Sequence, residues 1–351
     1  MKDKFVNKIY YYLIILSLLW SGGCQSIPVP PLDPEVPDVT PSPLSLPSSS
    51  PSPSPAITPT PSQTPSVPVP NLHLFNPPAG VAGEMVVFSD RDGDNEIYII
   101  DCGLGEIRQL TDNDASDLYP SWSQDRERIV FVSDRDGNLE LYSMAADGSA
   151  PERLTDNPDP DTFPAFSPDN EFIAYFSRVD GKDILRLMSV DSKSERTLAD
   201  FEDGIGGTIV FSPDGKLVFF GFERMDKYKI YLLELPDGTP REIMAHAKKE
   251  SRISTVVDPE GLGLLYVSGK GKQEDVWLNY VDDGRFTHIT KNTASDQSPS
   301  FSSDGGSVIF SSQRGGNNWQ IYAVSRKGKP SENELIRITD DEFNYYYPEC
   351  K

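Results

Sequence analysis

Short apolar runs separated by turn residues recur at nearly constant spacing from residue 83 onward. In one period, the run RIVFVS (128–133) is followed by the corner DRDGN, the run LELYSM (139–144) and a short polar turn. The runs are rich in Val, Ile, Phe and Tyr, which are favoured in β-strands. No stretch with helical periodicity interrupts them between residues 85 and 351. The pattern therefore predicts an all-β domain.

The period is about 44 residues when the units are aligned on one recurring turn. The units begin at Tyr119, Phe163, Gly207, Ser254 and Ser298, so successive starts are 44, 44, 47 and 44 residues apart. A repeat of this length that holds four strands is typical of a β-propeller blade. One blade cannot bury both of its faces, so blades must pack side by side until a ring closes.

The turn used for the alignment has its own physical explanation. In Ser212-Pro213-Asp214-Gly215, the serine can hydrogen-bond within the turn, proline fixes φ at the second position, and glycine accepts a positive φ. Asn170 stands in the place of the glycine in another unit, and asparagine also tolerates the left-handed region. We interpret this turn as part of the scaffold and not as an active site.

The two ends of the repeat region complement each other. The first unit, Gly83–Thr111, begins at a second strand and lacks an innermost one. The segment YYYPEC (345–350) matches only an innermost strand, because Pro348 aligns with Pro299. We predict that this segment pairs with Met85–Ser89. That pairing gives a six-bladed β-propeller with four-stranded blades and covers an otherwise open sheet edge.

Composition changes sharply before the repeats. Of the 31 prolines, 18 lie between Gln25 and Gly80, mixed with serine and threonine. Such a segment buries too little apolar surface to fold, and its prolines favour extended polyproline II. We predict a disordered stalk over residues 24–80 and a propeller over residues 81–351.

The first 23 residues have the pattern of a signal peptide. Three lysines precede the twelve-residue apolar run Ile9–Trp20, which is too short to cross a bilayer as a mature helix. SGGC (21–24) resembles a bacterial lipobox, with Ser21 where an aliphatic residue is usual. The resemblance implies that Cys24 is lipidated and anchors the protein to a membrane of the cell envelope. Ordinary cleavage that leaves a free Cys24 is the alternative.

The location expected from these features is the cell envelope, at the outer membrane, in the periplasm or at the cell surface. Gln25 follows the cysteine, instead of the Asp that retains many lipoproteins at the inner membrane, which favours an outer membrane where one exists. With 54 acidic and 32 basic residues the net charge is −22. Such a surface repels phosphate backbones, so we expect no nucleic-acid partner.

The pattern P-x-[FW]-S-P-D-G … I-Y … D-G … L-T, over Gly83–Lys351, resembles the TolB-like β-propeller repeat. Related repeats occur in the propellers of prolyl oligopeptidase relatives and of some pectin-degrading lyases, so the resemblance implies a fold more than a function. TolB itself carries an additional N-terminal domain and a partner-binding peptide, which the stalk replaces here. A role in the Tol–Pal system is therefore not implied.

No catalytic set is recognisable on the scaffold. The chain has no G-x-S-x-G nucleophile elbow. Its three histidines, His73, His246 and His288, have no metal-ligand spacing. We expect no enzymatic activity and no cofactor. A hydrolase or lyase that cleaves glycans with paired carboxylates stays open as the alternative, because sequence cannot show which carboxylates converge.

Two further candidates have ordinary explanations. The corner DRDGDNE (90–96) is rich in oxygen ligands, but its glycine does not fit a calcium loop of the EF-hand type. The same corner recurs at Asp134, so we interpret it as a hairpin turn and expect no metal. Cys102 and Cys350 fall on strands about two spacings, roughly 10 Å, apart. We expect packing thiols and not a disulfide.

Charged residues are placed regularly on one face of the predicted ring. The loops that link successive blades and the corners between second and third strands lie on the same face, which we call the mouth. The corners carry one basic residue per blade: Arg91, Arg135, Arg178, Arg224, Lys270 and Arg314. The linking loops bring Asp117, Asp161 and Asp296, with Asp203, Glu342, Tyr345, Tyr346 and Tyr347 also at the mouth.

Two interpretations of the mouth stay open. Arginine and aspartate can pair between neighbouring blades and lock the ring, or unpaired carboxylates and tyrosines can bind a partner. We favour locking for Asp117, Asp161 and Asp296, and recognition for the less regular Asp203, Glu342 and Tyr345–Tyr347. The function predicted is a monomeric, lipid-anchored binding or scaffold module for an envelope protein or glycan.

Overall fold

A computed structural model of the chain describes residues 72–73, 81, 83–201, 204–224, 227–244, 256–257, 263–270, 273–280, 285–326 and 335–350. The chain divides into two units after Ser62, and every described residue belongs to the second. The predicted signal peptide, Cys24 and most of the predicted stalk lie outside the described residues. The described residues contain no helix that could span a membrane.

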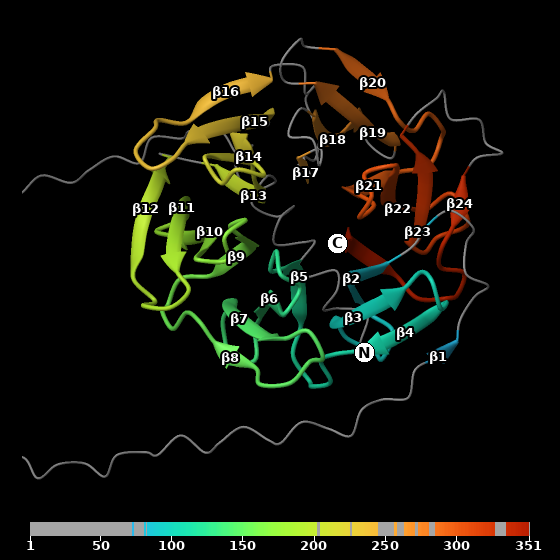
Figure 1. Cartoon of the computed structure of the whole chain (residues 1–351), viewed down its shortest axis with the longest axis horizontal. Coiled ribbons are helices and arrows are strands. Elements are labelled where there is room, and N and C mark those ends of the chain that lie inside the picture. Colours follow the sequence, from blue (N-terminus) through green and yellow to red (C-terminus); the bar gives the residue numbers. More distant parts are fainter. Residues whose placement is uncertain are drawn as a thin grey trace, which may run out of the picture. The chain divides into compact units, whose positions relative to one another are not determined.

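The described strands form six antiparallel sheets that follow one another around a ring (Figure 1). The second blade contains β5 (Asp117–Trp122), β6 (Arg128–Ser133), β7 (Glu140–Ala145) and β8 (Glu152–Arg153). The third contains β9 (Asp161–Phe166), β10 (Phe172–Val179), β11 (Lys182–Ser189) and β12 (Glu195–Asp200). The fourth contains β13 (Ile205–Phe211), β14 (Leu217–Arg224), β15 (Lys227–Glu234) and β16 (Arg241–Met244).

The fifth blade contains β17 (Val256–Val257), β18 (Gly263–Lys270), β19 (Gln273–Tyr280) and β20 (Phe286–His288). The sixth contains β21 (Asp296–Phe301), β22 (Ser307–Ser312), β23 (Gln320–Ser325) and β24 (Ile336–Arg337). Innermost strands of successive blades contact each other, from β5 through β9, β13, β17 and β21 to the first blade. The predicted six-bladed propeller is confirmed.

The first blade joins strands that are far apart in the sequence. Its order is β25 (Tyr345–Cys350), β2 (Glu84–Ser89), β3 (Glu96–Asp101), β4 (Glu106–Gln109) and β1 (Leu72–His73). Met85 pairs with Cys350 and Ser89 with Tyr345, as predicted for closure. The sequence pattern did not indicate β1, which adds a fifth strand within the range expected for the stalk.

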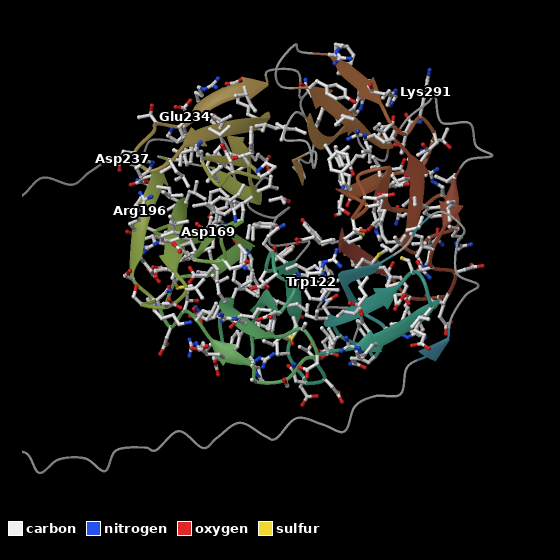
Figure 2. All side chains as sticks on the ribbon, in the orientation of Figure 1. Trp122, Asp169, Arg196, Glu234, Asp237 and Lys291 are labelled. Carbon is white, nitrogen blue, oxygen red and sulfur yellow. The ribbon has the colours of Figure 1, made fainter. Side chains whose placement is uncertain are left out.

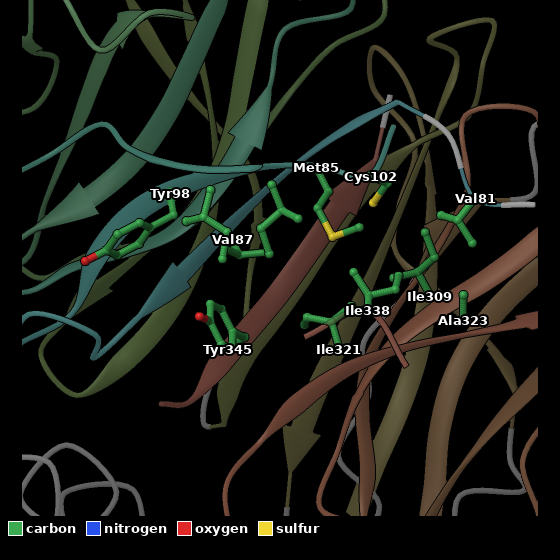
Figure 3. Close-up of a cluster of buried hydrophobic side chains, with 12 residues drawn as sticks. Val81, Met85, Val87, Tyr98, Cys102, Ile309, Ile321, Ala323, Ile338 and Tyr345 are labelled. Atoms are coloured by element: carbon green, nitrogen blue, oxygen red, sulfur yellow. The ribbon is translucent and has the colours of Figure 1, made fainter. Parts of the chain in front are cut away.

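The core lies between adjacent blades. At the closure, Met85, Val87 and Tyr98 of the first blade pack against Ile309 and Ile321 of the sixth (Figure 3). Both described cysteines, Cys102 and Cys350, are free thiols in or against this cluster. Burial raises the pKa of Cys102 to about 12, so this thiol is unreactive at neutral pH.

The recurring turn is built as the sequence pattern indicates. The Ser212 hydroxyl donates to Asp214 at 2.6 Å and accepts the Leu217 amide at 2.9 Å. Gly215 has φ +69°, and Asn170, which replaces it in the third blade, has φ +61°. In the third and fourth blades these turns therefore fix the hairpin between the first two strands, away from the mouth.

Candidate functional site

The mouth is formed by linking loops that are bonded to the corner of the preceding blade. The Asp117 amide donates to the Asn95 carbonyl (2.7 Å), the Asp161 amide to Leu139 (2.8 Å) and the Tyr345 amide to Trp319 (2.9 Å). The predicted placement of corners and linking loops on one face is therefore correct for these blades. Figure 2 shows the side chains, with Trp122 of β5 near the centre of the ring and Arg196 of β12 at its periphery.

Two of the regular aspartates are held by arginine. Arg135 Nη2 donates to both oxygens of Asp117, at 2.8 and 3.1 Å. Arg314 Nη2 donates to both oxygens of Asp296, at 2.8 and 2.9 Å. Both carboxylates are completely buried. Each of these pairs lies within one sheet, so the expectation that arginine and aspartate pair between neighbouring blades is wrong for Asp117 and Asp296.

Asparagine makes the connection between blades instead. The residue four positions before each regular aspartate donates its side-chain amide to that aspartate: Asn113 to Asp117 (2.9 Å), Asn157 to Asp161 (2.9 Å) and Asn292 to Asp296 (2.7 Å). The backbone amide of the same asparagine donates to an acid on the preceding blade: Glu96 (2.7 Å), Glu140 (3.1 Å) and Asp275 (3.4 Å). The constant four-residue spacing between asparagine and aspartate is the signal in the sequence that could have indicated this connection.

The third blade departs from this arrangement. Its corner arginine, Arg178, bonds Asp183 on β11 at 2.6 Å, and Asp183 also accepts the Gly206 amide of the next blade at 2.6 Å. Asp161 is fully buried and has no ion pair with any described cation, and its Oδ1 has no hydrogen bond. Burial raises the pKa of Asp161 to about 6, which the nearby Ser177 and Asn157 side chains only partly offset.

The first blade uses tyrosine in the place of the regular aspartate. The Tyr345 hydroxyl donates to Asp341 at 2.7 Å, and Arg91 Nη1 donates to both Tyr345 (2.7 Å) and Asp341 (2.6 Å). Burial, followed by the Asp341 charge, raises the pKa of Tyr345. Asn344 bonds Asp90 through its backbone and side-chain amides (2.8 and 2.7 Å). Tyr345 is therefore part of the closure network and is not exposed.

Aromatic side chains meet where the innermost strands approach each other. Tyr119, Phe163 and Tyr347 each precede the blade proline and have φ between +51° and +53°, a conformation that non-glycine residues rarely adopt. Each lies at a break in strand register, which turns its side chain out of the regular pleat. Their ring centroids are 4.4 Å apart for Tyr119–Phe163 and 5.0 Å for Tyr119–Tyr347.

Two further rings extend this group. Phe88 stacks on Tyr346 (centroids 5.1 Å apart) and on Tyr347 (5.6 Å). We call these five residues the axial aromatic cluster: Phe88, Tyr119, Phe163, Tyr346 and Tyr347. All except Phe88 are partly exposed. Ser298 of the sixth blade has the same conformation, with φ +50°, so the strained backbone is a bulge that four blades share, and the aromatic side chain is what distinguishes Tyr119, Phe163 and Tyr347.

The remaining predicted residues are less informative. Glu342 is exposed, and its carbonyl accepts a hydrogen bond from Asn318 at 2.6 Å. Asp203 and the side chains of Arg224 and Lys270 lie outside the described residues, as does His246. His288 stacks on Trp277 (3.8 Å) and its Nε2 lies 3.1 Å from Asp275. Of the predicted recognition residues, Glu342 is exposed and Tyr346 and Tyr347 are partly exposed, whereas Tyr345 is buried, as are Asp117, Asp161 and Asp296.

Comparisons with known proteins agree with this fold. Residues 75–204 match the family model PD40, the TolB beta propeller domain. A segment of 146 residues is 26% identical to the Tol-Pal system protein TolB of Campylobacter jejuni strain RM1221, covering 41% of this chain and 32% of that protein. A segment of 138 residues is 30% identical to an uncharacterized protein of Agrobacterium fabrum strain C58, covering 39% and 44%. The chain therefore matches less than half of the length of either relative.

A solved structure extends the likeness around the ring. The crystal structure of TolB from Acinetobacter baumannii superposes with a TM-score of 0.67 at 18% identity, covering 77% of this chain and 68% of that one. At this identity the superposition supports the fold alone. Together with the repeats and the closure by β25, these matches identify the folded part of the chain as a TolB-like β-propeller.

Proposed function

We propose that the protein is a binding module of the cell envelope that captures a protein partner at the axial aromatic cluster. The observation that carries the proposal is the convergence of the partly exposed rings of Tyr119, Phe163 and Tyr347. Aromatic rings supply large contact areas at low entropic cost, and they are enriched at binding hot spots. The kinship with TolB proteins, one of which carries the name Tol-Pal system protein, supports an envelope partner.

Charge defines the kind of partner. The exposed acids Asp112, Asp114 and Glu342 lie on linking loops of the mouth, and the whole chain carries a net charge of −22. Acids on the linking loops and aromatic rings on the innermost strands together favour a basic segment with aromatic or aliphatic side chains, because the acids attract it and the rings bind it. The proposed partner is therefore a protein with an exposed basic segment.

The location proposed for this activity is the cell envelope, at the outer membrane, in the periplasm or at the cell surface, with lipidated Cys24 as the anchor. The basic start, short apolar run and SGGC segment support this location. A proline-rich stalk of about 50 residues could hold the propeller at most on the order of 150 Å from the anchor. Partner and propeller could then meet at a distance from the bilayer.

The glycan-cleaving alternative receives no support from the regular acids. A glycosidase needs two accessible carboxyl groups flanking the bond to be cleaved. Asp117 and Asp296 are fully buried under arginine, and Asp161 is fully buried without one. We therefore propose binding and not hydrolysis.

Site-specific photocrosslinking in cells tests the proposal. A photoreactive phenylalanine at Tyr346 should give one prominent protein adduct, and raising the salt concentration should weaken it because the partner is basic. The same residue at Phe286, which is 64% exposed on the outermost strand β20, is the matched control. Replacing Tyr119 by Ala should reduce the Tyr346 adduct. An identical adduct from Phe286, or none from Tyr346, would refute binding at the cluster.

A further inference from the structure

The corner between β2 and β3 gathers three acids. Asp92, Asp94 and Glu96 each offer a carboxylate oxygen, and these oxygens lie within 4.8 Å of one another. Asp92 is exposed, Asp94 is partly buried and Glu96 is fully buried, so the group is open to solvent on one side only. The Gln109 side-chain amide on β4 donates to Asp92. Acidic groups are common on surfaces, so this gathering alone does not define a site.

The corresponding corner of the second blade has the same length and carries its own cation. There, Asp136, Asn138 and Glu140 stand in the places of Asp92, Asp94 and Glu96. Arg153 on β8 pairs with Asp136 at 3.4 Å and with Glu140 at 3.1 Å. Because Arg153 is thus held between the two acids, its guanidinium balances the charge of this corner.

In the first blade a neutral residue replaces that arginine. Tyr98 pairs with Gln109 in the register in which Tyr142 pairs with Arg153. Compared with the second blade, the first therefore loses one positive charge (Arg to Gln) and gains one negative charge (Asn to Asp). The difference is two charges, which is the charge of a divalent cation.

A buried hydroxyl provides an independent sign of a missing partner. In the second blade the Tyr142 hydroxyl donates to Asp136. The equivalent Tyr98 is only 2% exposed, yet its hydroxyl has no hydrogen-bond partner among the described residues. Tyr98 has the strand register of Tyr142, whose hydroxyl reaches the acid equivalent to Asp92, and we infer that the Tyr98 hydroxyl lies on the side of the three acids. A buried hydroxyl without a partner is costly, and a ligand or its bound water would satisfy it.

We propose that Asp92, Asp94 and Glu96 bind a calcium ion at the mouth of the first blade. Calcium takes six to eight oxygen ligands at about 2.3–2.6 Å in flexible geometry, so it can be shared by oxygens with this spacing. Water completes the shell on the open side, next to Asp92. The hairpin turn that explains the corner in sequence is present, with the Gly93 amide donating to the Asp90 carbonyl at 3.2 Å. The turn and the ion are compatible.

Thermal unfolding of the full chain, in EDTA and in 10 mM CaCl2 at equal ionic strength, tests the proposal. With affinity in the range of extracellular calcium modules, on the order of 10⁻⁴–10⁻³ M, the melting temperature should rise by about 3 °C or more in calcium. The absence of a rise would overturn the site. An equal rise in MgCl2 would overturn calcium as the ion.

Variants that give the corner of the first blade the residues of the second blade make the test specific. The double variant Asp94→Asn, Gln109→Arg copies the second blade and should lose the calcium-dependent rise while melting in EDTA at or above the wild-type temperature. Asp94→Asn alone should weaken calcium at least tenfold. Asp191→Asn, an exposed acid between β11 and β12, should keep the full rise. Retention of the calcium-dependent rise in the double variant, or its loss in Asp191→Asn, would refute the assignment of Asp92, Asp94 and Glu96 as the calcium ligands.

Discussion

Asp161→Asn should stabilise the protein at neutral pH, although it removes a buried and regularly placed acid. Asp161 is fully buried, and no described cation pairs with it. Its folded-state pKa of about 6 lies above the ordinary 3.8. The folded state therefore binds a proton more readily than the unfolded state between these values, and unfolding free energy falls as pH rises through this window.

The magnitude follows from the size of the shift. About two pKa units at 1.36 kcal/mol per unit correspond to roughly 3 kcal/mol of destabilisation by the ionised side chain above pH 6. Asparagine removes this charge and can still accept the hydrogen bond from Asn157. We expect Asp161→Asn to gain about 1–3 kcal/mol at pH 7.5 and to lose most of that advantage near pH 4, where Asp161 is protonated in the folded state and about half protonated in the unfolded state.

Urea unfolding at pH 4.5, 6.0 and 7.5 measures this effect, with Asp117→Asn as the matched control. Asp117 has the same position in its blade and the same burial, but Arg135 is bound to it. The control should lose about 3–5 kcal/mol at pH 7.5, because breaking a buried ion pair leaves a charge without its partner. If Asp161→Asn were destabilised at pH 7.5 by a similar amount, the claim that the unpaired charge of Asp161 lowers the free energy of unfolding would be refuted.

Three other predictions address the anchor, the closure and the packing between blades. Cys24→Ser should move the protein from the membrane to the soluble fraction, and persistence in the membrane fraction would exclude lipidation of Cys24 as the anchor. Deletion of residues 345–351 should lower the unfolding free energy by several kcal/mol and promote aggregation through the exposed β2 edge, measured by thermal melts and light scattering; an unchanged melting temperature would refute closure by β25. Gly206→Ala should cost about 1–3 kcal/mol, because the added carbon would lie 2.4 Å from the Phe176 ring; wild-type stability in urea would show that the ring yields.

The sequence predicted the features that repeat and missed those that break the repeat. Strand positions, blade number and the pairing of Met85–Ser89 with the last strand follow from alternating apolar runs and from one shared turn. The regular spacing also placed Arg135 and Asp117 on one face of the ring. A repeat pattern cannot show which acid pairs with a given arginine. Arg178, for example, binds Asp183 and not Asp161.

The axial aromatic cluster was beyond the sequence pattern for a different reason. Strand alternation assigns each side chain to one face of a sheet, but Tyr119 and Phe163 adopt positive φ at a register break and leave that alternation. Tyr345 was expected among the recognition residues, yet its hydroxyl lies buried between Arg91 and Asp341. Its neighbour Tyr346 is partly exposed. The strand register determines which of these two adjacent tyrosines is buried, and the composition of the segment cannot show it.

Closure of the ring by β25 also has a consequence for how fast the chain can fold. Asn344 and Asp90 meet across 254 residues, whereas consecutive strands of the second, third and fourth blades are joined by hairpins of a few residues. With loop entropy growing as (3/2)RT ln n, this contact costs about 3 kcal/mol more to form than a hairpin. The individual blades can therefore assemble early, and joining the first blade to the last is a late, slow step. Until then β2 presents an unpaired edge, so the incompletely folded chain can pair with other chains at that edge and aggregate.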